Sequence, residues 1–256
     1  MPQKLKTPLS QTLLLGLTIL ELLAREQKEI GVRELARNLE IKPTTVHRLL
    51  KSLQSRGYVE QNDAGEYSIG PAVLHLAHSY TSLNPIAKIA TKVFAAYRDR
   101  FEYNFYVGGV GVQFELIYLA VQESQGPIKI VVQPGSKFIG LHTTALGKVL
   151  LAYHPDQYIH EYIDQAIFTP LTDRSICAPE TLWEEIHGIR EQGYAINKGE
   201  RFSEIGAVGV PIRDRHGRLL ASLSLAYPQK LVEYGEIDTN KVLALARDIA
   251  RDIGNY

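Results

Sequence analysis

Apolar residues recur at helical spacing from Leu13 to about Gly70. The segment from Gln11 to Arg25 carries an apolar stripe formed by Leu13, Leu17, Leu20 and Leu23. Gly31 to Glu40 repeats the pattern over a shorter length. After a brief turn, a third helical pattern begins at Pro43 and ends at Gly57, residues suited to a helix start and a helix stop. We expect three short helices in close succession.

The third predicted helix separates apolar from polar positions. At about 100° per residue, one sector holds the apolar side chains of Val46, Leu49, Leu50 and Leu53. The opposite side holds Thr44, Arg48, Lys51 and Ser55, flanked by Thr45 and His47. From Ile41 to Tyr58 there are four positive residues and no acid. Because a solvated face usually mixes charges of both signs, this segregation favours a helix that binds nucleic acid.

A β-hairpin is predicted directly after this helix. Two short β-prone runs between Tyr58 and Ile69 flank the turn-forming segment Asn62 to Gly65. A helix, a tight turn, a cationic helix and a hairpin are typical of a winged helix-turn-helix, whose second helix enters the DNA major groove. The expected contacts to double-stranded operator DNA are Lys42, Thr44, Thr45, His47, Arg48 and Lys51. The alternative is a winged domain that binds a protein partner.

The second half of the chain changes from helical to mixed patterning. A helical stretch from Pro71 to about Arg100 has a break at Asn84–Pro85. Strands are then predicted over 103–109, 112–121, 128–135, 193–197, 205–214 and 218–227. Helices are predicted over 143–153, 155–165, 179–192 and about 239–253. Strands, helices and strands again favour an α+β domain with an antiparallel sheet.

Charge and cysteine content narrow the class of protein. Lys+Arg and Asp+Glu both number 28, so any nucleic-acid site must come from local clustering. The one cysteine, Cys177, excludes a disulfide within the chain and agrees with a cytoplasmic location. The apolar run from Leu13 to Ala24 is too short to span a bilayer and contains Glu21. It is therefore interpreted as a helix of the protein core, with no membrane association.

No enzymatic motif is evident. Gly140 to Lys148 resembles a phosphate-binding loop, but its spacing is two residues too long, and Val149 replaces the hydroxyl that would hold Mg²⁺. There is no G-x-S-x-G nucleophile elbow. His75 and His78 have a spacing that can bind metal, without an evident third ligand. We therefore expect neither an enzyme nor a metal or cofactor site.

The segment LHTTALGKVLLA, Leu141 to Ala152, suits the binding of a small anion. Its hydroxyls can cap a helix, and the free N–H groups of a helix start attract a carboxylate. His142, Thr143, Thr144 and Ala145 are the candidates here. The same leucines and glycine could equally serve packing alone.

Together, these segments resemble the IclR family of bacterial transcriptional regulators. KPTTVHRLLKSLQSRGYVEQ is similar to the family's DNA-reading segment, and LHTTALGKVLLA is similar to its LHATALGKALLA signature. The resemblance implies a winged helix-turn-helix domain over 1–75, a helical linker over 76–100 and a GAF-like effector-binding domain over 101–256. It also implies control by a small organic, carboxylate-bearing effector, and a homodimer or dimer of dimers on palindromic DNA.

The resemblance places the polar effector contacts of the family on particular residues. They fall on Asn197, Ala207, Ser224 and Ala226, so two polar positions are alanine in this chain. Each lost partner removes a hydrogen bond worth roughly 0.5–1.5 kcal/mol. We therefore hypothesise an effector that is larger or more apolar than small hydroxy- and keto-acids, such as an aromatic acid. Tyr118 and Tyr227 are candidate wall residues.

Overall fold

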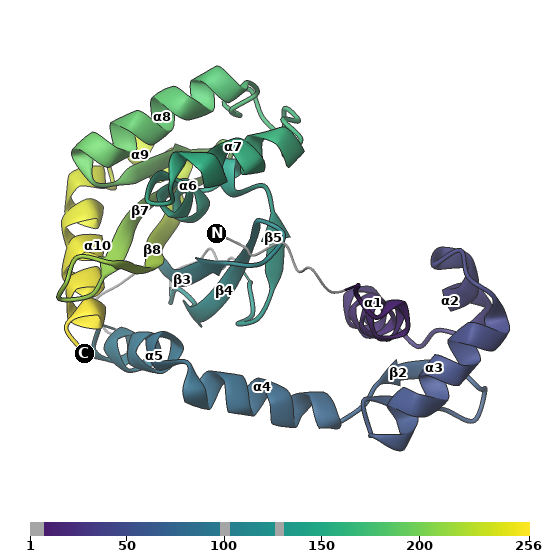
Figure 1. Cartoon of the computed structure of the whole chain (residues 1–256). Helices are drawn as coiled ribbons and strands as arrows, with labels where there is room; N and C mark the ends of the chain where they lie inside the picture. The colour runs from purple at the N-terminus through teal and green to yellow at the C-terminus, as the bar shows by residue number, and fades with distance from the viewer. Residues whose placement is uncertain (1–7, 98–102, 126–130) are drawn as a thin grey trace. The chain divides into compact units, whose positions relative to one another are not determined.

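The computed structural model describes residues 8–97, 103–125 and 131–256. The chain forms two compact units, Met1–Leu83 and Asn84–Tyr256 (Figure 1). The division falls between α4 (Ala72–Leu83) and α5 (Pro85–Tyr97), so the segment expected as a linker is shared by the two units. Each unit has its own hydrophobic core and is described separately.

The first unit has the predicted order of helices and a hairpin. Its helices are α1 (Gln11–Glu26), α2 (Val32–Asn38) and α3 (Pro43–Ser55), followed by strands β1 (Val59–Gln61) and β2 (Tyr67–Ile69) and by α4. β1 and β2 pair antiparallel and, with the turn Asn62–Glu66, form the wing. Ile30 adds a bridge to Tyr67, which ties the entry to α2 to the wing.

The core of this unit corrects one prediction about α1. The buried side of α1 consists of Gly16, Ile19, Leu22 and Leu23. Leu13 and Leu17 are 63% and 47% exposed, so only the second half of the predicted stripe, Leu20 and Leu23, joins the core. α1 packs on α3 and β2 through a face rotated from that stripe. In the described unit, the Leu13–Leu17 side is left as an apolar surface.

The second unit is built on one six-stranded sheet (Figure 1). Its strands are β3 (Asn104–Val110), β4 (Glu115–Gln122), β5 (Lys137–Ile139), β6 (Ala195–Lys198), β7 (Ile205–Arg213) and β8 (Leu219–Pro228). The order is β5-β4-β3-β8-β7-β6, and all neighbours are antiparallel. The predicted strand over 128–135 is wrong where it can be tested: 131–135 forms a loop and turn, and residues 128–130 lie outside the described residues.

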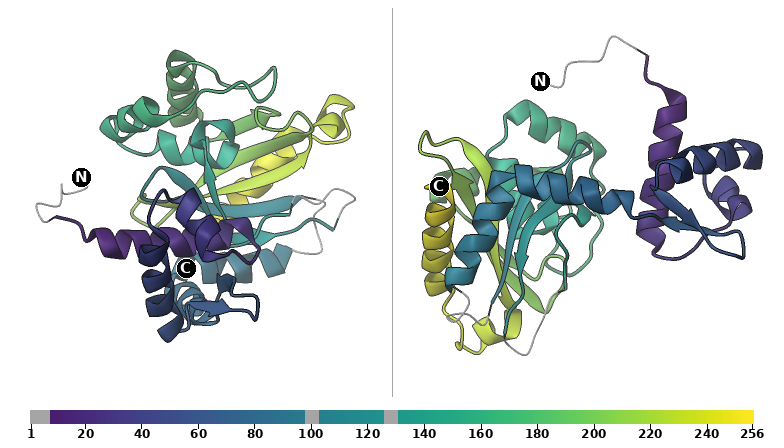
Figure 2. Two further views of the ribbon diagram at one scale, coloured as in Figure 1. Left: turned by 90° about the vertical axis from the view of Figure 1, so that its right-hand side faces the viewer. Right: turned by 90° about the horizontal axis from the view of Figure 1, so that it is seen from below.

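Helices cover both faces of the sheet (Figures 1 and 2). α5 and α10 (Thr239–Gly254) pack on one face, against alternate residues of the central strands such as Val107 and Leu223. The other face is covered by α6 (Ala145–Ala152), α7 (Asp156–Gln165) and α8 (Pro179–Gln192), preceded by the 3₁₀ turn η2 (Leu141–Thr143). The short α9 (Gln229–Glu233) follows β8 and was not predicted. We call the side covered by α6 to α8 the α6 face.

Candidate DNA and effector sites

The helix α3 presents the predicted DNA-binding residues on its outer side. Lys42, Thr44, His47, Arg48 and Lys51 are exposed and Thr45 is half-buried. The opposite side buries Val46, Leu49 and Leu50 in the core of the unit. Because these apolar anchors fix the rotation of α3, the cationic side must face solvent. This is the arrangement that a helix entering the major groove requires.

A hydrogen-bonded chain joins α3 to the wing. Lys51 Nζ donates to Gln54 Oε1 at 2.9 Å and to Gln61 Oε1 on β1 at 3.2 Å. Gln61 Nε2 then donates to the carbonyl of Gly65 at 3.2 Å, in the turn of the wing. Lys51 is therefore exposed but engaged, and it fixes the position of the wing relative to the recognition helix. The sequence did not predict this second role.

Cross-strand pairing gathers the predicted effector residues on the α6 face. Ala207 pairs with Asn197 on one side and Ala226 on the other, and Tyr106 pairs with Ser224. Directly paired residues point to the same side of a sheet. A register shift after Val107 pairs Gly108 with Tyr118, which brings the Tyr118 ring beside Tyr106 at 5.6 Å between centroids. Five residues predicted from distant sequence segments thus share one face.

The start of α6 lies directly on this face. A Cβ on Gly209, the cross-strand partner of Ser224, would lie 2.6 Å from the carbonyl oxygen of Ala145. Ser222 Oγ donates to the carbonyl of Leu146 at 2.9 Å. Glycine on β7 and serine on β8 therefore allow and hold the close approach of the helix start to the sheet.

Only one of the two threonines predicted to cap α6 does so. Thr144 is the N-cap, and its Oγ1 accepts from the Gly147 N–H at 3.0 Å. Thr143 does not cap: its hydroxyl donates to the carbonyl of Gly140 at 2.8 Å. Among the hydrogen bonds of the described residues, none uses the N–H groups of Ala145 and Leu146. These are orphan donors of a helix start, the groups that favour an anion.

Asn197 supports this loop from β6. Its Nδ2 donates to the carbonyl of Thr143 at 2.8 Å, and its Oδ1 accepts from the N–H groups of Gly199 and Glu200. The side chain is 6% exposed. Its amide is thus committed to holding η2 against the turn after β6, which makes Asn197 a positioning residue for the loop.

The Gly-Lys pair of LHTTALGKVLLA has a structural explanation. A Cβ on Gly147 would lie 2.2 Å from the carbonyl oxygen of Leu141, so only glycine allows the turn to fold back on the helix. Lys148 is completely buried, and its Nζ donates to Glu185 Oε1, Glu200 Oε1 and the carbonyl of Ile196 at 2.7 to 2.8 Å. Burial raises the pKa of Glu200, while Lys148 opposes that shift.

This buried ion cluster was missed by sequence reasoning. The available signal was a single lysine in an otherwise apolar octet, Ala145 to Ala152. A buried charge is tolerated only when it is paired and hydrogen-bonded. Lys148 meets this condition through Glu185 on α8 and the carbonyl of Ile196 on β6. The similarity to a phosphate-binding loop is therefore coincidental.

His142 is buried on the same loop with one unpaired nitrogen. It is 1% exposed, and its Nδ1 forms a short hydrogen bond with the hydroxyl of Tyr162 on α7. Burial, with a smaller contribution from the positive charge of Lys148, lowers the pKa of His142 to about 4. Its Nε2 has no partner in the described part of the chain. A neutral imidazole with an unsatisfied buried atom is unusual, because buried polar groups are normally hydrogen-bonded.

Comparison with known proteins explains the combination of the two units. The family model "Bacterial transcriptional regulator IclR C-terminal" matches residues 78–255, and the IclR helix-turn-helix model matches residues 12–63. The chain belongs to the IclR family. It is accordingly a DNA-binding transcriptional regulator with a C-terminal effector-binding domain, and its relatives are named as regulators, not enzymes.

The IclR assignment extends over nearly the whole chain. The glycerol operon regulatory protein of Streptomyces coelicolor is 31% identical, with 95% of this chain and 96% of the relative covered. The crystal structure of IclR from Thermotoga maritima is 26% identical, with a TM-score of 0.65 and coverage of 95% and 99%. An IclR homologue from Microbacterium hydrocarbonoxydans, solved with 4-hydroxybenzoate, shares the fold at 17% identity, with a TM-score of 0.81 and coverage of 95% and 98%.

The IclR-type sheet also places one candidate on the wrong side. Tyr227, proposed as a wall of the effector site, packs in the core beneath α5 and α10, next to Tyr103. Its neighbours Ala226 and Ser224 lie on the α6 face because alternate strand residues point to opposite sides. Tyr118, which the bulge turns toward Tyr106, stays on the α6 face.

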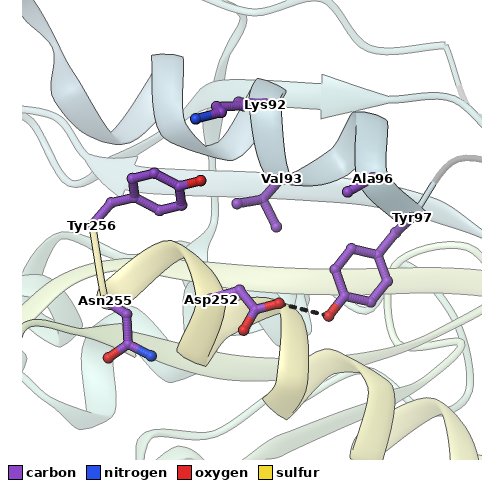
Figure 3. A pocket seen from close by; sticks show the side chains of 7 residues that line it. All are labelled: Lys92, Val93, Ala96, Tyr97, Asp252, Asn255 and Tyr256. Carbon is purple, nitrogen blue, oxygen red and sulfur yellow. Dashed lines mark hydrogen bonds between the residues drawn. The ribbon is translucent and has the colours of Figure 1, made fainter.

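The structure of this IclR-family chain has a hollow between α5 and α10 (Figure 3). It has a volume of roughly 380 Å³ and is lined by Lys92, Val93, Ala96, Tyr97, Asp252, Asn255 and Tyr256. Tyr97 donates to Asp252 Oδ2 at 2.7 Å, and Lys92 lies over the ring of Tyr256. Its prominent polar groups thus contact one another. This hollow lies on the opposite face of the sheet from the predicted effector residues.

Clusters of metal-binding side chains and membrane-spanning helices are both absent from the described residues. Within 8–97, 103–125 and 131–256, no group of three or more His, Cys, Asp or Glu side chains could hold a metal ion. No helix in the described residues has the length and apolar character needed to cross a membrane.

Proposed function

We propose that this regulator reads its operator through the outer side of α3 and responds to an aromatic or similarly apolar carboxylic acid bound at the α6 face. The observation that carries the first part is the cationic side of α3. Lys42, Thr44, Thr45, His47, Arg48 and Lys51 face away from a buried apolar anchor. Cations and hydroxyls hold phosphates, and the long side chains reach base edges. Because operator DNA lies in the bacterial cytoplasm, we place the protein there.

Arg48→Ala tests the DNA-binding side. Operator fragments are first selected from genomic DNA by their retention on the wild-type protein. We expect the variant to bind them about tenfold or more weakly, since a lost base contact costs roughly 1–3 kcal/mol. A lost phosphate contact instead lowers the salt slope by about one. Fluorescence anisotropy over a salt series measures both quantities.

The matched control is Arg25→Ala, which removes an exposed arginine of α1 that pairs with Glu26. Its affinity for the operator should stay at the wild-type level. Unchanged affinity of Arg48→Ala would reject the assignment of α3 as the reading helix. Weak salt dependence of the wild type would favour the rival function, a winged domain that binds protein.

The composition of the α6 face supports the effector class. Ala207 and Ala226 offer methyl groups at adjacent positions, while Tyr106 and Tyr118 supply flat apolar surface. The hydroxyl of Ser224 has no hydrogen-bond partner among the described residues and is available to a ligand. The orphan N–H groups of Ala145 and Leu146 favour a carboxylate. The related fold that was solved with 4-hydroxybenzoate supports an aromatic acid as the first compound to test.

Calorimetric titration distinguishes the effector classes. We expect 4-hydroxybenzoate to bind more tightly than glyoxylate or pyruvate. Tight binding of either small keto-acid would contradict the hypothesis. Binding must also change operator affinity, because an effector that binds both states of the regulator equally shifts no equilibrium.

A homodimer or dimer of dimers completes the proposed function. Dimers match the two half-sites of a palindromic operator. Two helices of the first unit carry exposed apolar side chains that support an interface: Leu13 and Leu17 on α1, and Leu74, Leu76 and Tyr80 on α4.

A further inference from the structure

Arg201 occupies an unusual position in the turn between β6 and β7. Its guanidinium lies over the ring of Phe138 on β5, 3.7 Å from the centroid, and 5.0 Å from the centroid of the Phe202 ring. Phe138 in turn reaches toward Gly140, where a Cβ would lie 3.4 Å from the end of its ring. The planar cation is thus held in place by aromatic rings beside the loop that starts η2.

The charge of Arg201 has no counter-ion in the described structure. No hydrogen bond or ion pair involves its guanidinium there. The adjacent carboxylate, Glu200, is taken by Lys148 at 2.8 Å. Arg201 is half-buried, and burial lowers its pKa, while the nearby Tyr118 opposes the shift. An arginine stays charged under such conditions, so a partly desolvated cation faces Tyr118 unneutralised.

His142, which lies in η2, provides a second, independent hydrogen-bond donor. The hydroxyl of Tyr162 accepts from the His142 backbone N–H at 3.2 Å, and burial raises the pKa of this tyrosine to about 12. The proton of that neutral hydroxyl is therefore available to His142 Nδ1, the nitrogen with which it forms its short bond. In a neutral imidazole, the remaining proton then belongs to Nε2. The Nε2 is thus a buried N–H donor that has no acceptor among the residues that the structure describes.

We propose that Arg201 binds the carboxylate of the effector, together with the N–H groups of Ala145 and Leu146, and that His142 Nε2–H binds a second acceptor oxygen of the same molecule. The ligand class is an aromatic acid that carries a hydroxyl or keto oxygen away from its carboxylate. This assignment rests on the proposed effector site at the α6 face. Phe138, Tyr118 and Tyr106 form the aromatic surroundings that select a flat body over an aliphatic chain. Guanidinium–carboxylate pairing is bidentate and charge-assisted, so Arg201 decides whether the acid or its neutral analogue binds.

The rival explanation is a surface arginine that stacks on Phe138 and keeps its charge hydrated. Arg213 is the matched control for this case, because its guanidinium lies 4.3 Å over the ring of Tyr153 at an exposed position. Arg201→Gln and Arg213→Gln each remove one arginine that stacks on an aromatic ring. Only the first is expected to affect ligand binding.

The experiment uses the full chain and pairs of aromatic acids with their primary amides. The probes are benzoate, 4-hydroxybenzoate and 4-hydroxyphenylacetate, each compared with its amide by isothermal titration calorimetry. We expect Arg201→Gln to weaken the acid that binds the wild type best by about 10- to 100-fold. Binding of the amide and binding by Arg213→Gln should change less than about threefold. Arg201→Lys should recover part of the acid affinity, since it restores charge without the bidentate geometry.

Other outcomes overturn the assignment and remain distinguishable from failure of the proposed function. Equal acid binding by the wild type and Arg201→Gln would reject Arg201 while leaving the effector site intact. Equal loss of acid and amide would show that Arg201 only shapes the site. If no acid binds the wild type at millimolar concentration, the aromatic-acid class and the role of Arg201 both fail. Thermal unfolding of each variant, measured in parallel, shows that the second unit, which holds Arg201, is folded.

Discussion

The protonation of His142 links its burial to stability in acid. Its folded-state pKa of about 4 lies below the ordinary value of 6.5 because burial disfavours the charged ring, and Lys148 adds to the effect. Between these two pH values the unfolded state binds a proton that the folded state does not. The stabilising contribution is therefore present above pH 6.5 and is lost as the pH falls toward 4. At about 1.4 kcal/mol per pKa unit, it amounts to roughly 3 kcal/mol.

We predict that His142→Gln reduces the pH dependence of unfolding in this window. Chemical denaturation of the second unit at several pH values from 4 to 6.5 measures the difference in unfolding free energy between wild type and variant. Taking this difference cancels the pH dependence that both proteins share. The shared part includes Glu200, whose raised pKa has the opposite effect and makes the fold less stable as the pH rises through that pKa. His216→Gln, in an exposed turn, is the control. Parallel curves for wild type and His142→Gln would contradict the prediction.

At the scale of elements, the hydrogen bonds of Lys51 and Gln61 join α3 to the wing. We predict that Gln61→Ala weakens operator binding about three- to tenfold, the range of one hydrogen bond worth roughly 0.5–1.5 kcal/mol. The change removes one of the two acceptors of Lys51 Nζ and the donor to the Gly65 carbonyl, and it replaces none of the predicted DNA-contacting side chains of α3. Operator affinity by fluorescence anisotropy is the readout.

Glu60→Ala is the neighbouring control on the same strand. Removing an acid from a DNA-binding surface should leave the affinity unchanged or raise it. An equal loss of affinity in both variants would instead indicate a general effect on the fold of the wing, and would remove the special role of Gln61.

Periodicity predicted the elements whose neighbours impose a single register. The buried anchors of α3 and the alternation along β7 and β8 are visible in the sequence because one side must be apolar. β5 was missed because its three residues, with Lys137 and Ile139 exposed, carry no alternation toward a core. The run 131–135 was mistaken for a strand because its valines are β-prone, yet it has no strand partner. Local propensity is a weak guide where tertiary pairing decides.

The gathering of the candidate effector residues on one face was predictable to the extent that family motifs fix cross-strand neighbours. Asn197, Ala207, Ser224 and Ala226 come together because β6, β7 and β8 are adjacent in the sheet. Arg201 and the acceptors of Lys148 were not predictable. Their environment depends on where Phe138, Glu185 and Glu200 lie in space, and no spacing along the chain encodes those contacts.

At the scale of the whole molecule, the apolar side of α1 left outside the core has a consequence for assembly. Leu13 and Leu17 lie one helical turn apart and are exposed in the described unit. Leu9, four residues before Leu13 and ahead of the helix, is exposed as well. Exposed apolar rows of this kind mark protein–protein contacts. An isologous contact between two α1 helices would set the distance between two recognition helices, which a palindromic operator requires.

We predict that Leu13→Glu combined with Leu17→Glu separates assembly from DNA reading. Light scattering after size-exclusion chromatography should detect a smaller species or a weaker association than in the wild type. Affinity for an operator with two half-sites should fall much more than affinity for a single half-site, because the second contact loses its effective concentration. Lys28→Glu, near the end of α1 but off the apolar row, is the control for added negative charge. Equal losses on one and two half-sites would mean that α1 supports the fold of each reading unit, and would leave the interface to α4 or to the second unit.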